Sequence, residues 1–136
     1  MEDLLTQLGT RYGVQVARAG DGWKLDLPIR GAFACSLSIG PDALDWAANI
    51  REAASGREVF TDWNDYLNYD NTPIPELLRE KRQDIEWFVG RWNAASSVRV
   101  IFKKHLFGLL TKQLVQWQHD GEWYGIILGD PERPTE

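Results

Sequence analysis

Hydrophobic and polar residues recur with two different periods along the chain, and the longer period marks one helix clearly. Over about residues 74–93, apolar residues follow three- and four-residue steps, as they do on one face of an α-helix. These residues are Ile74, Leu77, Leu78, Ile85, Phe88, Val89 and Trp92, with Lys81 as the single interruption. Pro73 and Pro75 mark the start of the helix, with Asn71 or Thr72 as its cap.

Shorter segments predict β-strands, several by an alternation with a period of two, and residues 32–39 by an apolar character on both faces that suggests a central strand. They cover residues 14–18, 23–27, 32–39, 57–61, 97–103, 109–118 and 123–128. Asp-Gly pairs at 21–22 and 120–121 predict tight hairpins between neighbouring strands. Ahead of the strands, the leucines of residues 2–11 fall on one face and predict a short helix.

Residues 43–51 fit both periods. The even-numbered residues from Leu44 to Ile50 are apolar, as in a strand, whereas a stripe from Ala43 to Ala53 and a good alanine propensity favour a helix. We favour the strand, because turn-forming segments lie on both sides of it. The elements together predict an α+β fold, in which an antiparallel sheet built as a meander of hairpins packs against the long helix, with a short N-terminal helix beside it.

The 136 residues are typical of a single domain covering 1–136, with a polar tail at 130–136 that we expect to be frayed. The net charge of -5 argues against a broad surface for nucleic acid or an anionic membrane, and favours a basic protein partner. The N-terminus lacks the features of a signal peptide, and no apolar run approaches the ~18 residues of a membrane span. We therefore expect a cytoplasmic protein with no membrane partner.

Catalytic and metal-binding motifs are missing from the sequence. Cys35 lies in an apolar run and is expected to be a small buried side chain, and a reducing compartment fits a lone cysteine. His105 and His119 have no zinc-ligand spacing, although a pairing of either with Cys35 stays open. We expect no cofactor, no metal and no enzyme activity. Of seven tryptophans, three can fill the core, and the others suggest a partner surface.

The segment TDWNDYLNYDN (61–71) repeats an acid or amide followed by an aromatic residue at steps of three. Its candidate partner-binding residues are Asp62, Trp63, Asp65, Tyr66, Tyr69 and Asp70. A calcium loop is excluded, because Leu67 and Pro73 stand where such a loop needs Gly and Glu. Two interpretations remain: the aromatic residues pack inward from a 3₁₀ or α turn, or some face outward and bind.

The distribution of charge favours the second interpretation. Residues 62–76 contain four acids and no base, whereas residues 94–119 contain four bases and no acid. The two segments either neighbour and neutralise each other, or give the molecule an acidic face for a basic partner. Carboxylates steer such an encounter, and Trp and Tyr anchor it.

The run GREVFTDWNDYLNYD (56–70) and the helix PELLREKRQDIEWFVGRW (75–92) resemble small acidic bacterial immunity proteins of polymorphic-toxin systems. This resemblance implies a stoichiometric inhibitor that binds a cognate toxin. A type III secretion chaperone is resembled by the start of the chain, in LLTQLGTRYG and the later ACSLSIG. Such chaperones typically end with a C-terminal helix, whereas the last elements predicted here are strands. A third hypothesis is a small enzyme or ligand-binding domain with an acidic–aromatic cleft.

Overall fold

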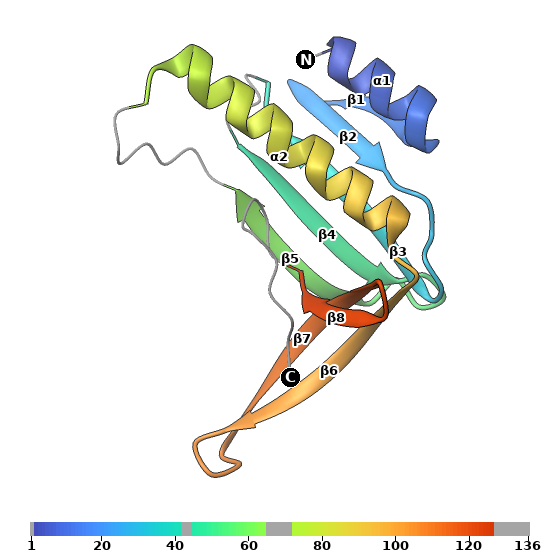
Figure 1. The fold of residues 1–136 in the computed structure, drawn as a ribbon, viewed down its shortest axis with the longest axis vertical. Helices are drawn as coiled ribbons and strands as arrows, with labels where there is room; N and C mark the ends of the chain where they lie inside the picture. Colours follow the sequence, from blue (N-terminus) through green and yellow to red (C-terminus); the bar gives the residue numbers. More distant parts are fainter. Residues whose placement is uncertain (1, 42–44, 65–71, 127–136) are drawn as a thin grey trace.

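Two helices and eight antiparallel strands make up the part of the chain that the structure, a computed structural model, describes: residues 2–41, 45–64 and 72–126. In chain order they are α1 (Glu2–Tyr12), β1 (Gln15–Ala19), β2 (Gly22–Asp26), β3 (Phe33–Ile39), β4 (Trp46–Glu52), β5 (Glu58–Asn64), α2 (Ile74–Ala94), β6 (Ser97–His105), β7 (Leu110–His119) and β8 (Glu122–Gly125). The predicted α+β fold, with a short N-terminal helix and one long helix, is confirmed (Figure 1).

The strands form two sheets, where the sequence suggested one. Strands β1 to β5 pair in sequence order, and β6, β7 and β8 form a separate three-stranded sheet. Every connection within a sheet is a hairpin, as the predicted meander requires. At the β7–β8 turn, Asp120 and Gly121 both have positive φ (53° and 80°), which is the geometry of a type I′ turn.

Residues 46–52 form strand β4, so the strand interpretation of this ambiguous segment is confirmed. β4 lies between β3 and β5, and Trp46, Ala48 and Ile50 are buried on the side that faces α2. In that position, period-two burial outweighs the helix propensity of the alanines.

Helix α2 is the element that both sheets share. It lies across one face of the five-stranded sheet, with α1 alongside (Figure 1). The Phe88 ring lies 5.7 Å from the ring of Trp46 in the first sheet and 5.3 Å from that of Trp117 in the second. Ile85 on the same helix face is completely buried. The predicted apolar stripe of this helix is therefore the centre of the core.

Three features of α2 refine the sequence prediction. Ile74 is exposed although it belongs to the apolar stripe, and Lys81, the interruption of that stripe, is buried. Pro73 holds the cap position and makes no side-chain cap bond, so Thr72 is not the cap. Asn71, the other predicted cap, lies outside the described residues.

Arg30 ties the β2–β3 connection to the end of α2. Its guanidinium donates hydrogen bonds to the backbone carbonyls of Trp92 and Asn93, and the Trp92 indole donates to the Pro28 carbonyl at 2.7 Å. A cation on the last carbonyls of a helix also complements the helix dipole. This connection fixes the direction of α2 over the sheet.

Candidate functional site

Two of the six predicted site residues, Asp62 and Trp63, lie within the described chain. Both belong to β5, which ends at Asn64, three residues later than the sequence suggested. One of the two interpretations of this segment, a 3₁₀ or α turn, is therefore wrong for residues 60–64. The other four predicted residues, Asp65, Tyr66, Tyr69 and Asp70, lie outside the described residues.

Strand alternation places Asp62 and Trp63 on opposite faces of the sheet. Asp62 is paired with Ala48 on the α2 side and is half-buried. Trp63 is paired with Ala47, so its indole lies on the face away from α2, where it is 60 % exposed. A Trp this exposed is unusual, because the side chain gains more from burial than almost any other. The two residues do not form one continuous acidic–aromatic patch.

Trp63 instead lines a pocket at one end of the five-stranded sheet, which we call the Trp63 pocket. Its volume is about 340 Å³. Its lining consists of Ala19, Asp21, Gly22, Ser38, Ile39, Gly40, Pro41, Asp45, Trp46 and Trp63. These residues come from the β1–β2 turn, the end of β3, the start of β4 and the end of β5.

Two glycines allow the backbone segments under the pocket to approach closely. A Cβ atom on Gly22 would lie 2.0 Å from the Ile39 carbonyl oxygen, and one on Gly40 would lie 2.4 Å from Asp45 Oδ1. The Gly40 amide also donates to the Asp45 carbonyl at 3.0 Å. Gly22 and Gly40 therefore let Ile39 and Asp45 come close beside the pocket, and packing of this kind helps to position binding side chains.

The described residues that line the Trp63 pocket include two acids and no basic side chain. Asp21 and Asp45 supply two carboxylates, and Trp63 supplies an aromatic face. This combination favours a Lys or Arg side chain, which pairs with a carboxylate and stacks on an indole. Asp21 and Asp45 were missed in the sequence. In a meander, however, the β1–β2 and β3–β4 turns lie at the same end of the sheet as the end of β5, which is the signal that brings them together.

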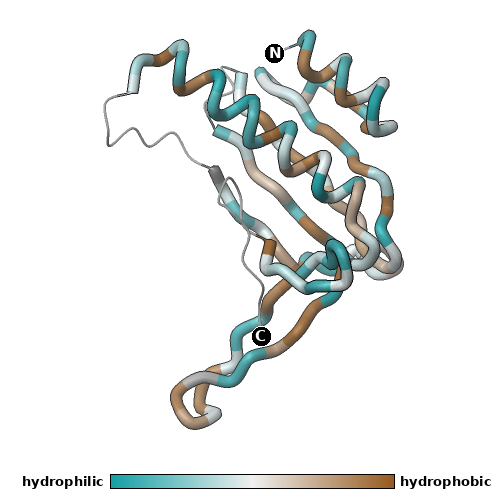
Figure 2. The backbone as a smooth tube through the Cα atoms, in the orientation of Figure 1, coloured by the Kyte–Doolittle hydropathy of each residue, from teal (hydrophilic) through white to brown (hydrophobic). Residues whose placement is uncertain are grey.

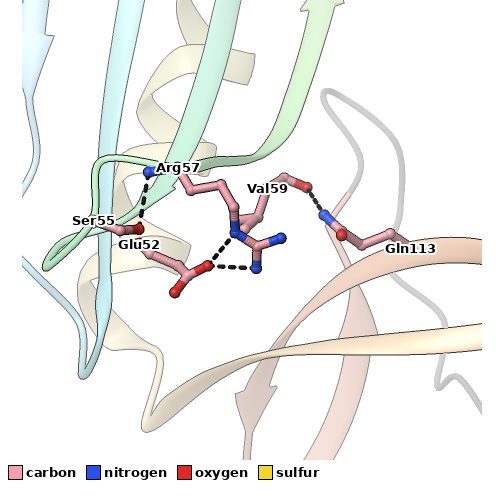
Figure 3. A network of polar contacts seen from close by, with 5 residues as sticks. All are labelled: Glu52, Ser55, Arg57, Val59 and Gln113. Atoms are coloured by element: carbon pink, nitrogen blue, oxygen red, sulfur yellow. Dashed lines mark hydrogen bonds and ion pairs between the residues drawn. The ribbon is translucent and has the colours of Figure 1, made fainter.

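The outer edge of β5 is occupied at two points. The backbone amide of Trp63 donates to Asp62 Oδ1 at 2.9 Å. A bulge leaves Val59 without a partner on β4. The Val59 carbonyl accepts a 2.7 Å hydrogen bond from the Gln113 side chain of β7, and the Glu52–Arg57 ion pair lies beside this bond (Figure 3). These bonds hinder the addition of another strand, so a partner is better recognised through the Trp63 side chain.

A small polar network lies on the same sheet face as Trp63. Asn49 Nδ2 donates to Glu58 Oε2 at 2.7 Å and to Thr61 Oγ1 at 2.9 Å. Hydrogen bonds from Thr61 and Asn49 lower the pKa of Glu58 below its usual value. Glu58 is therefore ionised at neutral pH and adds to the acidity of this face.

Cys35 is a buried structural side chain, as the sequence predicted. It lies on β3 with 3 % exposure, and burial raises the pKa of its thiol, against a smaller opposing effect of the Arg51 charge. His119 lies on β7 in the other sheet, where its ring is 5.6 Å from that of Trp117. The side chain of His105 is not among those described. A buried thiol with a raised pKa supplies little thiolate and is a poor nucleophile.

We expect Cys35 to react at least about a hundredfold more slowly with a thiol reagent in the native protein than in urea, because both burial and the raised pKa suppress the thiolate. The measurement is the rate of reaction with Ellman's reagent at pH 8 in the two conditions. Equal rates would show that the β3 core opens readily or that Cys35 is accessible.

Neither helix in the described ranges has the length and apolar composition of a membrane span. Residues 2–41, 45–64 and 72–126 also contain no group of three or more His, Cys, Asp or Glu side chains placed to bind a metal ion. Comparisons with protein-family models, with curated proteins and with solved structures find no match to this chain.

Proposed function

We propose that this chain is a stoichiometric protein-binding protein of the immunity type, which neutralises a basic cognate toxin in the cytoplasm. The observation that carries the proposal is the 60 % exposed indole of Trp63, in a pocket where the described lining residues supply two carboxylates and no base. The net charge of -5 and the resemblance in residues 56–70 and 75–92 agree with this function.

The Trp63 pocket has the composition of a binding hot spot. Trp, Tyr and Arg carry most of the binding energy at protein interfaces, where a central aromatic residue is buried against its partner. Covering the exposed six-tenths of a Trp side chain is worth about 2–4 kcal/mol at ~25 cal/mol per Å². Asp21 and Asp45 then steer a basic partner and fix its orientation.

A second function is favoured by the volume of the same pocket. At ≈ 340 Å³ it lies within the range of about 300–1,000 Å³ that is typical of small-ligand sites. An indole beside two carboxylates is also a suitable surface for a sugar or a small cation. A small ligand that binds at Trp63 with no protein partner would favour this alternative.

The first test of the proposed function is co-expression with the product of the neighbouring gene, followed by affinity purification. We expect co-elution at equal stoichiometry, and relief of growth inhibition where the neighbouring product is toxic. Failure of both, with each protein folded, would contradict the immunity proposal.

We further expect Asp21→Lys with Asp45→Lys to slow association with that partner by about tenfold or more at low salt, because carboxylates near an interface act mainly on the association rate. Stopped-flow mixing over a range of salt concentrations measures the effect. Glu2→Lys with Asp3→Lys, on α1, is a control with the same change in net charge. If both double variants slow association equally, only net charge matters and the pocket is not the contact.

A further inference from the structure

The β6–β7 hairpin extends beyond the rest of the molecule and ends in exposed apolar side chains (Figure 1). We call these side chains the hairpin tip: Leu106, Phe107, Leu109 and Leu110. Phe107 is fully exposed and Leu109 is 82 % exposed. Figure 2 shows that this end of the hairpin is predominantly hydrophobic. Exposed apolar patches of this kind mark sites of protein or membrane interaction.

The backbone of the hairpin loop directs large side chains into solvent. Leu106, Phe107 and Gly108 all have left-handed φ values, 51°, 57° and 85°. Large L-residues rarely adopt this conformation, and here neither Leu106 nor Phe107 becomes buried through it. Strained backbone that exposes apolar side chains is a feature of functional loops, which leads us to look for what the tip contacts.

Lysines lie directly behind the hairpin tip. Lys103 of β6 is paired with Lys112 of β7, and Lys104 is the next residue toward the tip. Like charges that face each other across two strands are destabilising. Residues 94–119 contain no acid, and none of the ion pairs among the described residues involves these three lysines. An external anion would relieve the repulsion.

The apolar hairpin tip and the lysines behind it stand in the same order as the acyl chains and the headgroups at the surface of a bilayer. Strand β6 ends at His105, and Lys104 and Lys103 lie one and two residues before it. At ~3.4 Å per residue, these lysines are about 3–7 Å behind the end of the strand. Interfacial segments bury their apolar side chains about 5–10 Å into the headgroup and acyl boundary, and basic residues pair with anionic headgroups. We propose that the hairpin tip inserts into the surface of an anionic lipid bilayer.

Two features favour a bilayer over a protein contact. All four side chains of the hairpin tip are more than half exposed, two on each side of Gly108 in the chain. A bilayer surrounds an inserted hairpin on all sides, whereas most protein surfaces cover one face. A second copy of this chain, docked tip to tip, would bring two sets of lysines together, which is repulsive.

The proposal concerns the hairpin tip alone. The net charge of -5 opposes broad binding of the molecule to an anionic membrane, as the sequence indicated. Exposed charges are screened beyond about 10 Å at 0.1 M salt, so a local group of lysines on a projecting hairpin acts largely independently of the acidic body.

The test is the partition of the full chain onto sedimenting vesicles at about 0.1 M salt. One set of vesicles is phosphatidylcholine, and the other contains one part phosphatidylglycerol to two parts phosphatidylcholine. We expect binding to the anionic vesicles only. Phe107→Ser with Leu109→Ser should weaken it by at least tenfold, because both side chains leave water on insertion. Ile29→Ser, at an equally apolar exposed position away from the hairpin, should leave it unchanged.

The lysines are tested by Lys103→Gln with Lys112→Gln. Each lysine near an anionic surface contributes about fivefold to binding, so this variant should bind roughly 25-fold more weakly. All substituted side chains lie at the surface or partly so, and an unchanged melting temperature verifies that the variants fold.

Insertion itself is measured with an environment-sensitive dye on Phe107→Cys, while the buried Cys35 stays unlabelled. A blue shift with anionic vesicles at this position, and none at Ile29→Cys, supports the proposal. If the protein partitions to neither kind of vesicle, the proposal is overturned, and a protein partner is the remaining explanation for the hairpin tip. Binding that survives Phe107→Ser with Leu109→Ser also overturns it, because the lysines then adsorb without insertion.

Discussion

Ile85→Asp is expected to unfold the protein, or to lower its melting temperature by about 15 °C or more. Ile85 is completely buried on the face of α2 that packs against the sheets. The substitution removes a large apolar side chain and buries a carboxylate, which together cost about 4–5 kcal/mol or more. This is comparable with the whole stability of a typical domain, about 5–15 kcal/mol. Circular dichroism during thermal unfolding measures the effect.

The matched control is Gln83→Asp, which introduces the same carboxylate on the exposed side of the same helix. It should change stability by no more than about 0.5 kcal/mol. Ile85→Val keeps the protein folded and should cost about 1 kcal/mol. A normal melting temperature for Ile85→Asp would show that α2 does not pack against the sheets as described.

Trp63→Ala is expected to weaken partner binding by about 30-fold or more while leaving the fold intact. The exposed part of the indole is worth about 2–4 kcal/mol if a partner covers it, and every 1.4 kcal/mol is a tenfold change in affinity. Since Trp63 is 60 % exposed, its removal should lower stability by far less than that of a core Trp. Calorimetric titration of the partner gives the affinity, and thermal unfolding gives the stability.

The long helix was predictable from sequence because its period of 3.6 is sustained over five turns, from Ile74 to Trp92. The strands were predictable from alternation and turn residues. The division into two sheets was not, because alternation shows which side chains share a face but not which strands pair. The contacts of Phe88 with tryptophans from both sheets, which decide the arrangement, join residues far apart in sequence.

The candidate site was only partly predictable. Trp63 was found from the repeat of acids, amides and aromatic residues in 61–71, but the three-residue step of that repeat suggested a turn where β5 continues. A run of five residues from Phe60 to Asn64 is too short to separate a period of three from a period of two. Asp21 and Asp45 required the hairpins to be folded before they could be placed beside Trp63.

The exposure of the hairpin tip could not be predicted from the sequence, for a different reason. The sequence LFGLL (106–110) reads as apolar residues around a turn, and apolar runs next to strands are usually buried. Only the projection of β6 and β7 beyond α2 leaves these residues without a core to join (Figure 1).

One set of titrations tests whether the protein acts by binding another protein at the Trp63 pocket. The co-purified partner is titrated with the wild type, with Trp63→Ala and with Ile29→Ala, an exposed apolar position outside the pocket. We expect binding at equal stoichiometry, a loss of about 30-fold or more for Trp63→Ala, and no change for Ile29→Ala. Equal affinities for all three proteins would contradict it.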